Sequence, residues 1–325
     1  MKAAAPIVLP NVSERRHVHI INPNAGSKKY YSAAVSAIEK SGEERLESTS
    51  GEHLRNLVSE LFRRDPFAHA IVYGGDGSVY EAVNGIMESG AAATASFSVF
   101  PAGSGNDFSA FANDKAGFKK AELNKIDLIS VSHGGKRDYF ANMMNIGFDC
   151  AVVKETYTLK KKPFLKGPAA YIAGVLKVLA VKKTIPAKIK LSGVVSLDKK
   201  APQEDIVMEK NILLTACANG RYCGGGFNAA SLAMLNDGLM DVLVVNDVSR
   251  AKFISIVGNY KKGDYISEDG SMMSSFKNVI DYYKCRRMEI IGPEMICLDG
   301  EVIETGREEA VVAEVHPGAV WFAAI

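Results

Sequence analysis

The chain has 325 residues, of which 47% are hydrophobic and 23% are charged, and these fractions are ordinary for a soluble globular protein. Its length exceeds the usual size of a single hydrophobic core, so two domains are expected. The net charge of +2 gives no indication of a nucleic-acid partner. The five cysteines are scattered without a C-x-x-C pair, which disfavours a disulfide framework or a zinc site and favours a reducing compartment.

From the sequence we expect neither a signal peptide nor a membrane-spanning helix. The N-terminal stretch Met1–Pro10 has one lysine and too short an apolar run for a signal peptide. The most apolar helical candidate, Pro168–Val181, contains Lys177 and is too short to cross a bilayer. We therefore expect a cytoplasmic protein that is soluble, or at most peripheral at the inner face of the membrane.

Strand and helix signals alternate over residues 1–130, which is the pattern of a parallel sheet covered by helices on both faces. The expected elements are, in chain order, strand His17–Asn22, helices Tyr31–Lys40 and Glu52–Arg63, strand His69–Tyr73, helix Ser78–Glu88 and strand Ser96–Phe100. All three strands end in a polar loop that contains glycine. In a parallel α/β sheet such loops lie together beyond the carboxyl ends of the strands, where ligands bind.

Residues 131–325 have a different pattern, in which alternating apolar and polar residues predict strands joined by few helices. Strands are expected within Arg137–Ile146, Asn211–Ala218, Leu239–Val245, Val279–Ile291 and Ala310–Val315, and helices at Pro168–Val181 and Ala251–Lys261. This half is predicted to be a mostly antiparallel β domain. The final strand fits either this domain or a return to the first one, and the pattern leaves both open.

The loop Gly74–Ser78 follows an expected strand and wraps three glycines around Asp76. Because glycine has no Cβ, backbone N–H groups can approach a phosphate, and the following helix adds unpaired N–H donors and the positive end of its dipole. A carboxylate suits such a site if a Mg²⁺ or a reacting hydroxyl lies between it and the phosphate. On this loop alone, phosphate binding and a plain strand-to-helix turn are equally good interpretations.

Further polar loops supply candidate carboxylates in the second half of the chain. They stand at positions 237 and 241, after the glycine-rich segment 219–226, and at positions 299 and 301, between two apolar runs. Each is a candidate metal ligand or general base. The alternative is structural, because Asn-Asp-Gly and Asp-Gly are common hairpin signals and Asp241 alternates with apolar neighbours in a strand. His17 and His19 share one strand face without an evident carboxylate partner, so they are interpreted as strand residues.

Taken together, the motifs resemble those of the diacylglycerol kinase catalytic-domain family, and most of all its soluble bacterial lipid kinases of the diacylglycerol kinase B, YegS and BmrU type. Sphingosine and ceramide kinases are more distant relatives, and the similarity runs from about His19 to Trp321. The motifs are, in the family's order, Asn22-Pro23-x-x-Gly26, Gly74-Gly75-Asp76-Gly77-Ser78, Pro101-x-Gly103-Ser104-x-Asn106-Asp107-Phe108, Asn219-Gly220 with Gly224-Gly225-Gly226, Asp237-Gly238-Leu239 and Asp299-Gly300-Glu301. Two positions depart from the family pattern, since Ser78 replaces the usual Thr and Tyr80 the usual Asn.

The resemblance implies an N-terminal doubly wound α/β nucleotide-binding domain, of the NAD kinase and diacylglycerol kinase type, over residues 1–130. It implies a C-terminal β-sandwich domain over residues 131–325, with ATP bound in the cleft between the two. The implied reaction is an ATP- and Mg²⁺-dependent transfer of the γ-phosphate to a lipid hydroxyl at a membrane surface. Diacylglycerol, which would give phosphatidic acid, is the first candidate acceptor.

The resemblance also implies roles for individual positions. The expected nucleotide contacts are Asn22, Thr49, Gly74, Gly75, Asp76, Gly77, Ser78, Ser104 and Asn106. Asp76 would bind the nucleotide's Mg²⁺ through water. Glu301 would act as the base, with Asp299 positioning it or the metal, and the sequence leaves open which of the two accepts the proton. A second, structural Mg²⁺ would be held by Asp237 and the main-chain carbonyls of Met234 and Leu239.

Other interpretations stay open at this point. A kinase of another lipid, such as phosphatidylglycerol or a sphingoid base, fits the same motifs. A small-molecule kinase related to NAD kinases or phosphofructokinases fits the glycine loop, although Pro101–Phe108 matches the lipid-kinase loop. A nucleotide-binding regulator without catalysis is disfavoured by the intact Asp76, Asp299 and Glu301. A homodimer is a further open alternative.

A lysine-rich segment surrounds the expected helix Pro168–Val181. Its members are Lys160, Lys161, Lys162, Lys166, Lys177, Lys182, Lys183, Lys188 and Lys190. Such a segment fits an anionic membrane surface, where a lipid substrate would be met, and the helix could line a groove for an acyl chain. It fits an ordinary solvated helix at least as well.

Overall fold

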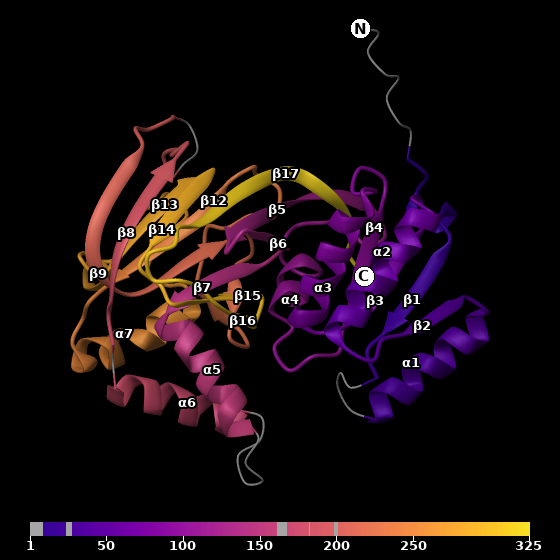
Figure 1. The fold of residues 1–325 in the computed structure, drawn as a ribbon, viewed down its shortest axis with the longest axis horizontal. Coiled ribbons are helices and arrows are strands. Elements are labelled where there is room, and N and C mark those ends of the chain that lie inside the picture. Colours follow the sequence, from indigo (N-terminus) through magenta and orange to yellow (C-terminus); the bar gives the residue numbers. More distant parts are fainter. Residues whose placement is uncertain (1–8, 24–27, 161–167, 182, 198–200) are drawn as a thin grey trace, which may run out of the picture.

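The computed structural model describes residues 9–23, 28–160, 168–181, 183–197 and 201–325. Figure 1 shows two halves side by side, an α/β half built from the first part of the chain and a strand-rich half built from the rest. The long strand β17 (Val311–Ala323) extends from one half to the other. Lys161, Lys162, Lys166 and Lys182 of the lysine-rich segment, and Gly26 of the first loop, lie outside the described residues.

The N-terminal half is a parallel sheet with helices on both faces, as the sequence predicted. Its strands are β1 (His17–Ile21), β2 (Glu44–Glu47), β3 (His69–Gly74) and β4 (Ser96–Pro101), in the spatial order β2-β1-β3-β4. Its helices are α1 (Lys28–Ser41), α2 (Gly51–Arg64), α3 (Asp76–Ser89) and α4 (Asp107–Ala112), after a 3-10 turn at Val12–Glu14. Helix α3 begins two residues earlier than predicted, because Gly75 already serves as its N-cap and puts Asp76 in the first turn.

Apolar side chains explain why this sheet is covered on both sides. Successive residues of a strand point to opposite faces. Val18 and Ile20 of β1 accordingly belong to the core formed with α2 and α3, whereas the neighbouring Ile21 packs with Ile38 of α1. This arrangement confirms the doubly wound α/β class predicted for the first half.

The C-terminal half consists of antiparallel strands that remain hydrogen-bonded to the N-terminal sheet. Its strands before β17 are β5 (Leu123–His133), β6 (Lys136–Phe140), β7 (Met143–Gly147), β8 (Ile185–Ser192), β9 (Ile206–Ala218), β10 (Tyr222–Cys223), β11 (Phe227–Asn228), β12 (Met240–Asn246), β13 (Ile280–Cys285), β14 (Arg287–Ile291), β15 (Met295–Leu298) and β16 (Glu301–Glu304). Two predicted strands are each split in two, at residues 141–142 and at Arg286. Strand β17 pairs antiparallel with β5 and β14 and parallel with β4, so it joins both halves.

Three helices form a layer along one side of the strand-rich half (Figure 1). They are α5 (Phe148–Lys160), α6 (Pro168–Val181) and α7 (Arg250–Lys262), and a 3-10 turn follows at Ser274–Phe276. Helix α6 has the predicted bounds, α7 is one residue longer at each end, and α5 was not predicted. Phe148, Leu179 and Ile256 of these helices pack with Leu213 and Leu243 of the sheet. Of the described helices, none is long and apolar enough to cross a membrane.

Candidate functional site at the junction of the two halves

The glycine loop lies at the carboxyl end of β3 and leads directly into α3. It is in contact with the loop that follows β4, because a Cβ placed on Gly75 would lie only 2.8 Å from Cα of Gly103. Real Cβ atoms do not approach that closely, so both positions need glycine. The backbones of the two loops therefore form one continuous surface at the start of α3.

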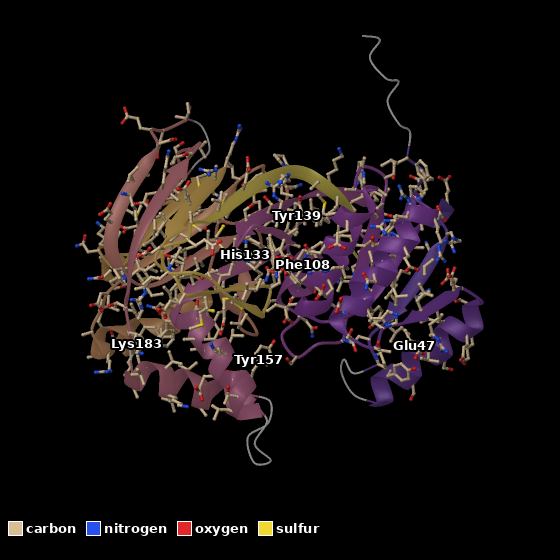
Figure 2. The ribbon with its side chains drawn as sticks, viewed as in Figure 1. Glu47, Phe108, His133, Tyr139, Tyr157 and Lys183 are labelled. Atoms are coloured by element: carbon tan, nitrogen blue, oxygen red, sulfur yellow. The ribbon has the colours of Figure 1, made fainter. Side chains whose placement is uncertain are left out.

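Asp76 stands in the first turn of α3 and reaches across to the start of α4. One oxygen of its carboxylate, Oδ1, accepts a hydrogen bond of 3.0 Å from the backbone N–H of Phe108, which lies where the two halves meet (Figure 2). The other, Oδ2, lies against Gly105, where a Cβ would be 2.8 Å away. Burial raises the pKa of Asp76, while the backbone N–H groups around it act in the opposite direction. The carboxylate is thus held near the amino ends of two helices, where anions bind.

Asp107 joins the two halves of the chain at this point. Its carboxylate accepts hydrogen bonds of 2.9 Å from the N–H of Gly225 and 2.7 Å from the N–H of Gly226. Both glycines have positive φ, at +80° and +101°, and other residues would be strained there. Burial, and then the charge of Asp76, raise the pKa of Asp107 to about 6. Local sequence patterns place Asp107 in a motif but predict no role for it, because its partners are more than a hundred residues away in the chain.

Asp299 holds the Asp-Gly-Glu loop in place from inside the protein. Only 4% of the residue is exposed, and its carboxylate accepts hydrogen bonds of 3.1, 3.2 and 2.7 Å from the backbone N–H groups of Ala141, Asn142 and Met143. Burial raises its pKa to about 7, against the lowering effect of these N–H donors. Because both oxygens are engaged by the backbone, Asp299 anchors the loop on β7.

Glu301 is presented to the glycine loop from the opposite half. A Cβ placed on Gly77 would lie 3.0 Å from Oε1 of Glu301, so the carboxylate faces the first turn of α3. The side chain remains accessible to solvent. Partial desolvation, and then the charge of Glu81, raise its pKa. Beside it, the hydroxyl of Tyr157 on α5 donates a 3.2 Å hydrogen bond to the carbonyl oxygen of Gly300 (Figure 2 labels Tyr157).

The remaining residues that were predicted to contact the nucleotide lie around these loops, and their side chains differ in exposure to solvent. Ser78 is buried, and its hydroxyl lies against Gly74. Asn106 has a left-handed backbone, and its amide makes two hydrogen bonds to the backbone of Gly103, which fixes the second loop. Ser104, between them in that loop, is exposed.

Asn22 and Thr49 follow the first two strands of the sheet. The backbone N–H of Asn22 donates to the carbonyl of Tyr73, so its loop borders β3. Thr49 is exposed, and its hydroxyl lies 2.9 Å from Nδ1 of His53. The start of α2 is close to α3, because a Cβ on Gly51 would be 2.9 Å from a carboxylate oxygen of Glu81.

The predicted second metal site lies in a separate region, in the loop that precedes β12. The backbone N–H of Leu239 donates a 3.1 Å hydrogen bond to Oδ1 of Asp237. Oδ2 of Asp237 is 3.6 Å from the ammonium group of Lys284. This lysine is buried, and its ammonium group also bonds Asp241 at 2.7 Å and the carbonyl of Leu232 at 2.9 Å. Asp241 is thus a strand residue paired with a buried lysine, in line with its structural interpretation. The described ranges contain no group of three His, Cys, Asp or Glu side chains that could hold a metal ion.

The interpretation of the histidines on β1 needs correction. Glu43 bonds both of them, with 3.0 Å between its Oε1 and Nδ1 of His17 and 2.7 Å between its Oε2 and Nε2 of His19. The pairing was missed because Glu43 precedes β2, which lies beside β1 in space but 24 or more residues away in the chain. The two histidines therefore share Glu43 as a carboxylate partner, far from the end of the strand that leads to the glycine loop.

Two family models match the chain in succession. The diacylglycerol kinase catalytic domain matches residues 16–134, and the YegS C-terminal NAD kinase beta sandwich-like domain matches residues 142–324. These matches confirm the predicted family and the succession of an α/β domain and a β-sandwich domain.

Curated relatives align over part of their length. A "probable lipid kinase YegS-like" of Shewanella frigidimarina (strain NCIMB 400) is 30% identical over 214 residues, which cover 63% of this chain and 62% of the relative. A protein of the same name from Stenotrophomonas maltophilia (strain K279a) is 30% identical over 187 residues, or 55% and 56% of the two chains. The aligned part therefore spans less than two thirds of these relatives.

Solved structures with the same fold align almost end to end. A structure described as a putative diacylglycerol kinase from Bacillus anthracis str. Sterne superposes with a TM-score of 0.68, at 20% identity, over 96% of this chain and 97% of that one. A second structure, of a diacylglycerol kinase from the same organism, has a TM-score of 0.62 at 19% identity. At this level of identity the likeness shows the fold.

Proposed function

The chain belongs to the family defined by a diacylglycerol kinase catalytic domain followed by a YegS C-terminal domain, and we propose that it is an ATP- and Mg²⁺-dependent lipid kinase. In the reaction, the bond between the γ-phosphorus and the oxygen that stays with ADP breaks. A bond to the acceptor oxygen forms, and the hydroxyl proton passes to the protein. The observation that carries the proposal is the position of Glu301 opposite Gly77 at the amino end of α3.

The phosphates of ATP would bind along the surface formed by the two glycine loops. Gly75 and Gly103 approach each other without side chains, so backbone N–H groups are exposed to a ligand there. The amino ends of α3 and α4 add unpaired donors and positive dipole ends. Exposed Thr49 and Ser104 are proposed as further contacts at the rim of this surface.

The carboxylates at this surface fit a Mg²⁺ ion that accompanies the nucleotide. An oxygen of Asp76 and an oxygen of Asp107 converge on Gly105, where a Cβ would lie 2.8 and 3.4 Å from them. Mg²⁺ prefers oxygen ligands and is usually held by one or two carboxylates together with waters and substrate phosphates. The ion would neutralise charge on the phosphates during transfer. Asp76 and Asp107 are the residues proposed to hold it, directly or through water.

Glu301 is proposed as the acceptor of the hydroxyl proton. Its carboxylate is accessible and faces the glycine loop, and its raised pKa makes it a better base than an ordinary surface glutamate. Asp299 is a poorer candidate because three backbone N–H groups already occupy its oxygens. We therefore assign Asp299 to the positioning of Glu301.

A second Mg²⁺ at Asp237, with the carbonyls of Met234 and Leu239, is proposed as a structural ion. It would share the carboxylate of Asp237 with the ammonium of Lys284. Such an ion would act on the stability of the loop before β12, and no step of the transfer is assigned to it.

The proposed acceptor is diacylglycerol, which would become phosphatidic acid. The family name and the names of the relatives support a lipid, and phosphatidylglycerol and sphingoid bases are the alternatives within that class. The test is to offer labelled ATP with a lipid extract and to identify the labelled product. Label in phosphatidic acid would support diacylglycerol as the acceptor, and label in another lipid would identify that lipid's precursor as the acceptor instead. Label in a soluble metabolite would contradict the proposal that the acceptor is a lipid.

The assignment of catalytic residues is tested by Asp76→Ala and Glu301→Ala. Each is expected to abolish phosphoryl transfer while far-UV circular dichroism and the melting temperature show a folded protein. Near-wild-type turnover of either variant would overturn its role. A chain that binds ATP but consumes none with any lipid offered would instead be a nucleotide-binding regulator.

A further inference from the structure

The helical layer of the strand-rich half exposes large apolar side chains. Leu176 and Val181 on α6 are 62% and 58% exposed, and Ile254 on α7 is 62% exposed. Side chains of this size are normally covered when they lie close together, and an exposed cluster indicates a binding surface. These three residues are called the apolar ridge below.

Helical spacing and one arginine bring the ridge residues to the same place. On α6, Leu176 and Ala180 lie one turn apart on the exposed side, whereas Leu179 is buried against the sheet. Arg250, at the start of α7, donates hydrogen bonds of 3.0 and 2.8 Å to the carbonyls of Leu179 and Ala180. Because Ile254 stands one turn after Arg250, it lies on the same side of α7 as that arginine.

The charged residues on the two helices that carry the ridge are all cationic. The described helices α6 and α7 contain lysine and arginine but no aspartate or glutamate. Lys177 is largely exposed on α6, where it forms a 2.7 Å ion pair with Glu155 of α5, and Lys183 follows it beside the same layer (Figure 2). Apolar side chains bordered by cations are the combination that binds the interface of an anionic membrane.

The layer is also connected to the proposed catalytic loop. The hydroxyl of Tyr157 on α5 bonds the carbonyl of Gly300, and Lys154, one turn earlier, forms a 3.4 Å ion pair with Glu304 on β16. Helix α5 in turn packs on α6, where a Cβ on Gly174 would be 2.8 Å from the hydroxyl of Thr156. Helix α5 therefore links the layer that carries the ridge to the Asp-Gly-Glu loop.

We propose that the α5–α6–α7 layer docks on an anionic lipid bilayer, with Leu176, Val181 and Ile254 in the interface and the neighbouring lysines at the headgroups. The inference rests on the proposed function, since a lipid kinase must take its acceptor from a membrane. It adds the surface by which the chain does so.

The test is co-sedimentation of the full chain with vesicles of phosphatidylcholine, with and without phosphatidylglycerol. The chain is expected to bind the anionic vesicles, and to release them at about 0.5 M salt, where the Debye length falls to a few ångströms. The triple variant Leu176→Ser, Val181→Ser, Ile254→Ser should bind at least tenfold more weakly. Val207→Ser is the matched control, because Val207 is 61% exposed on β9, away from the layer.

Three results would overturn the docking surface. They are wild-type binding by the triple variant, an equal loss in Val207→Ser, and equal binding to neutral vesicles at every salt concentration. Melting curves check that the triple variant is folded, and single substitutions replace it if it is not.

A second measurement separates this surface from the proposed function. Phosphorylation of dispersed short-chain dioctanoylglycerol should be the same in wild type and triple variant, whereas phosphorylation of vesicle-embedded diacylglycerol should fall. If the wild type binds the vesicles but phosphorylates no lipid, the proposed kinase activity is contradicted while the proposed docking surface still stands. If the triple variant has full activity on vesicle-embedded diacylglycerol, the proposed docking surface is contradicted while the proposed kinase activity still stands.

Discussion

The side chain of Glu301 fills the space that a β-carbon on Gly77 would need. A Cβ there would lie 3.0 Å from Oε1, although the two residues come from opposite halves of the chain. The absence of a side chain at Gly77 therefore sets how closely the proposed base can approach the amino end of α3.

Gly77→Ala is expected to lower kcat/KM about 10- to 100-fold, since displacing a catalytic group by a fraction of an ångström to an ångström has effects of this size. Glu301 is flexible and can move aside, so the fold should be retained. Gly258→Ala in α7 is the control, because a Cβ there meets nothing within 4 Å. Steady-state kinetics on both variants decide the matter, and equal activities would contradict the proposed approach.

Glu301→Gln and Asp299→Asn should fail in different ways. The first removes a proton acceptor and should lower kcat by about 10²–10⁴ without a change in melting temperature. The second leaves backbone N–H groups of residues 141–143 facing an amide, and should cost about 1–3 kcal/mol of unfolding free energy. Chemical denaturation and kinetics together distinguish the two. Loss of stability in Glu301→Gln alone would reverse the assigned roles.

The pH dependence of the rate should report on Glu301. The carboxylate must be ionised to accept a proton, so its raised pKa moves the acid limb of kcat/KM to higher pH than an ordinary glutamate would give. Glu81 contributes to that rise, and Glu81→Gln should therefore shift the limb to lower pH. Glu88→Gln is the control, because both glutamates bond Arg55 but Glu88 is not among the charges that act on Glu301. If the acid limb of Glu81→Gln is unshifted, the limb reports the ionisation of a group other than Glu301.

Asp107→Asn should weaken the connection between the two halves. The carboxylate accepts two hydrogen bonds from the N–H groups of Gly225 and Gly226, and an amide can satisfy only one of them. We expect a loss of about 1–3 kcal/mol in unfolding free energy together with a large loss of activity. The exposed Asp114 offers a control in Asp114→Asn. Unchanged stability would mean that the two glycine N–H groups find other acceptors.

Mg²⁺ without nucleotide should raise the melting temperature of the wild type if Asp237 holds a structural ion. At about one hundred times its Kd the ion would stabilise the fold by about 2.7 kcal/mol. Asp237→Asn should lose this increment, and the exposed Asp264→Asn should keep it. A wild type whose melting is indifferent to Mg²⁺ would leave the ammonium of Lys284 as the cation at Asp237.

Local patterns were enough to predict the loops of the candidate site. The parallel-sheet rule brought the loops after β1, β3 and β4 to one edge, and the apolar run Pro168–Val181 gave α6 with its observed bounds. Helix α5 was missed because Val152, Val153 and Thr156 favour strands in isolation, and packing on α6 and the sheet overrides that preference.

Contacts between distant segments were outside the reach of such patterns. The pairing of Asp107 with Gly225 and that of Asp241 with Lys284 depend on how sheets align, and no local spacing records them. The same holds for Asp299, whose sequence context is that of a hairpin. Its anchoring role follows only from the three N–H groups of a strand far away in the chain.

Strand β17 makes the two halves inseparable as folding units. Trp321 and Phe322 pair with Ser96 and Phe97 of β4, and the ring of Phe322 packs 5.3 and 5.4 Å from those of Phe97 and Phe108. A fragment that ends near residue 134 would lack this strand and leave two phenylalanines of its core uncovered. Residues more than two hundred positions apart must therefore meet before the nucleotide-binding half is complete, and closing so long a loop slows folding. Engineering that exchanges one half between relatives must carry β17 with the α/β half.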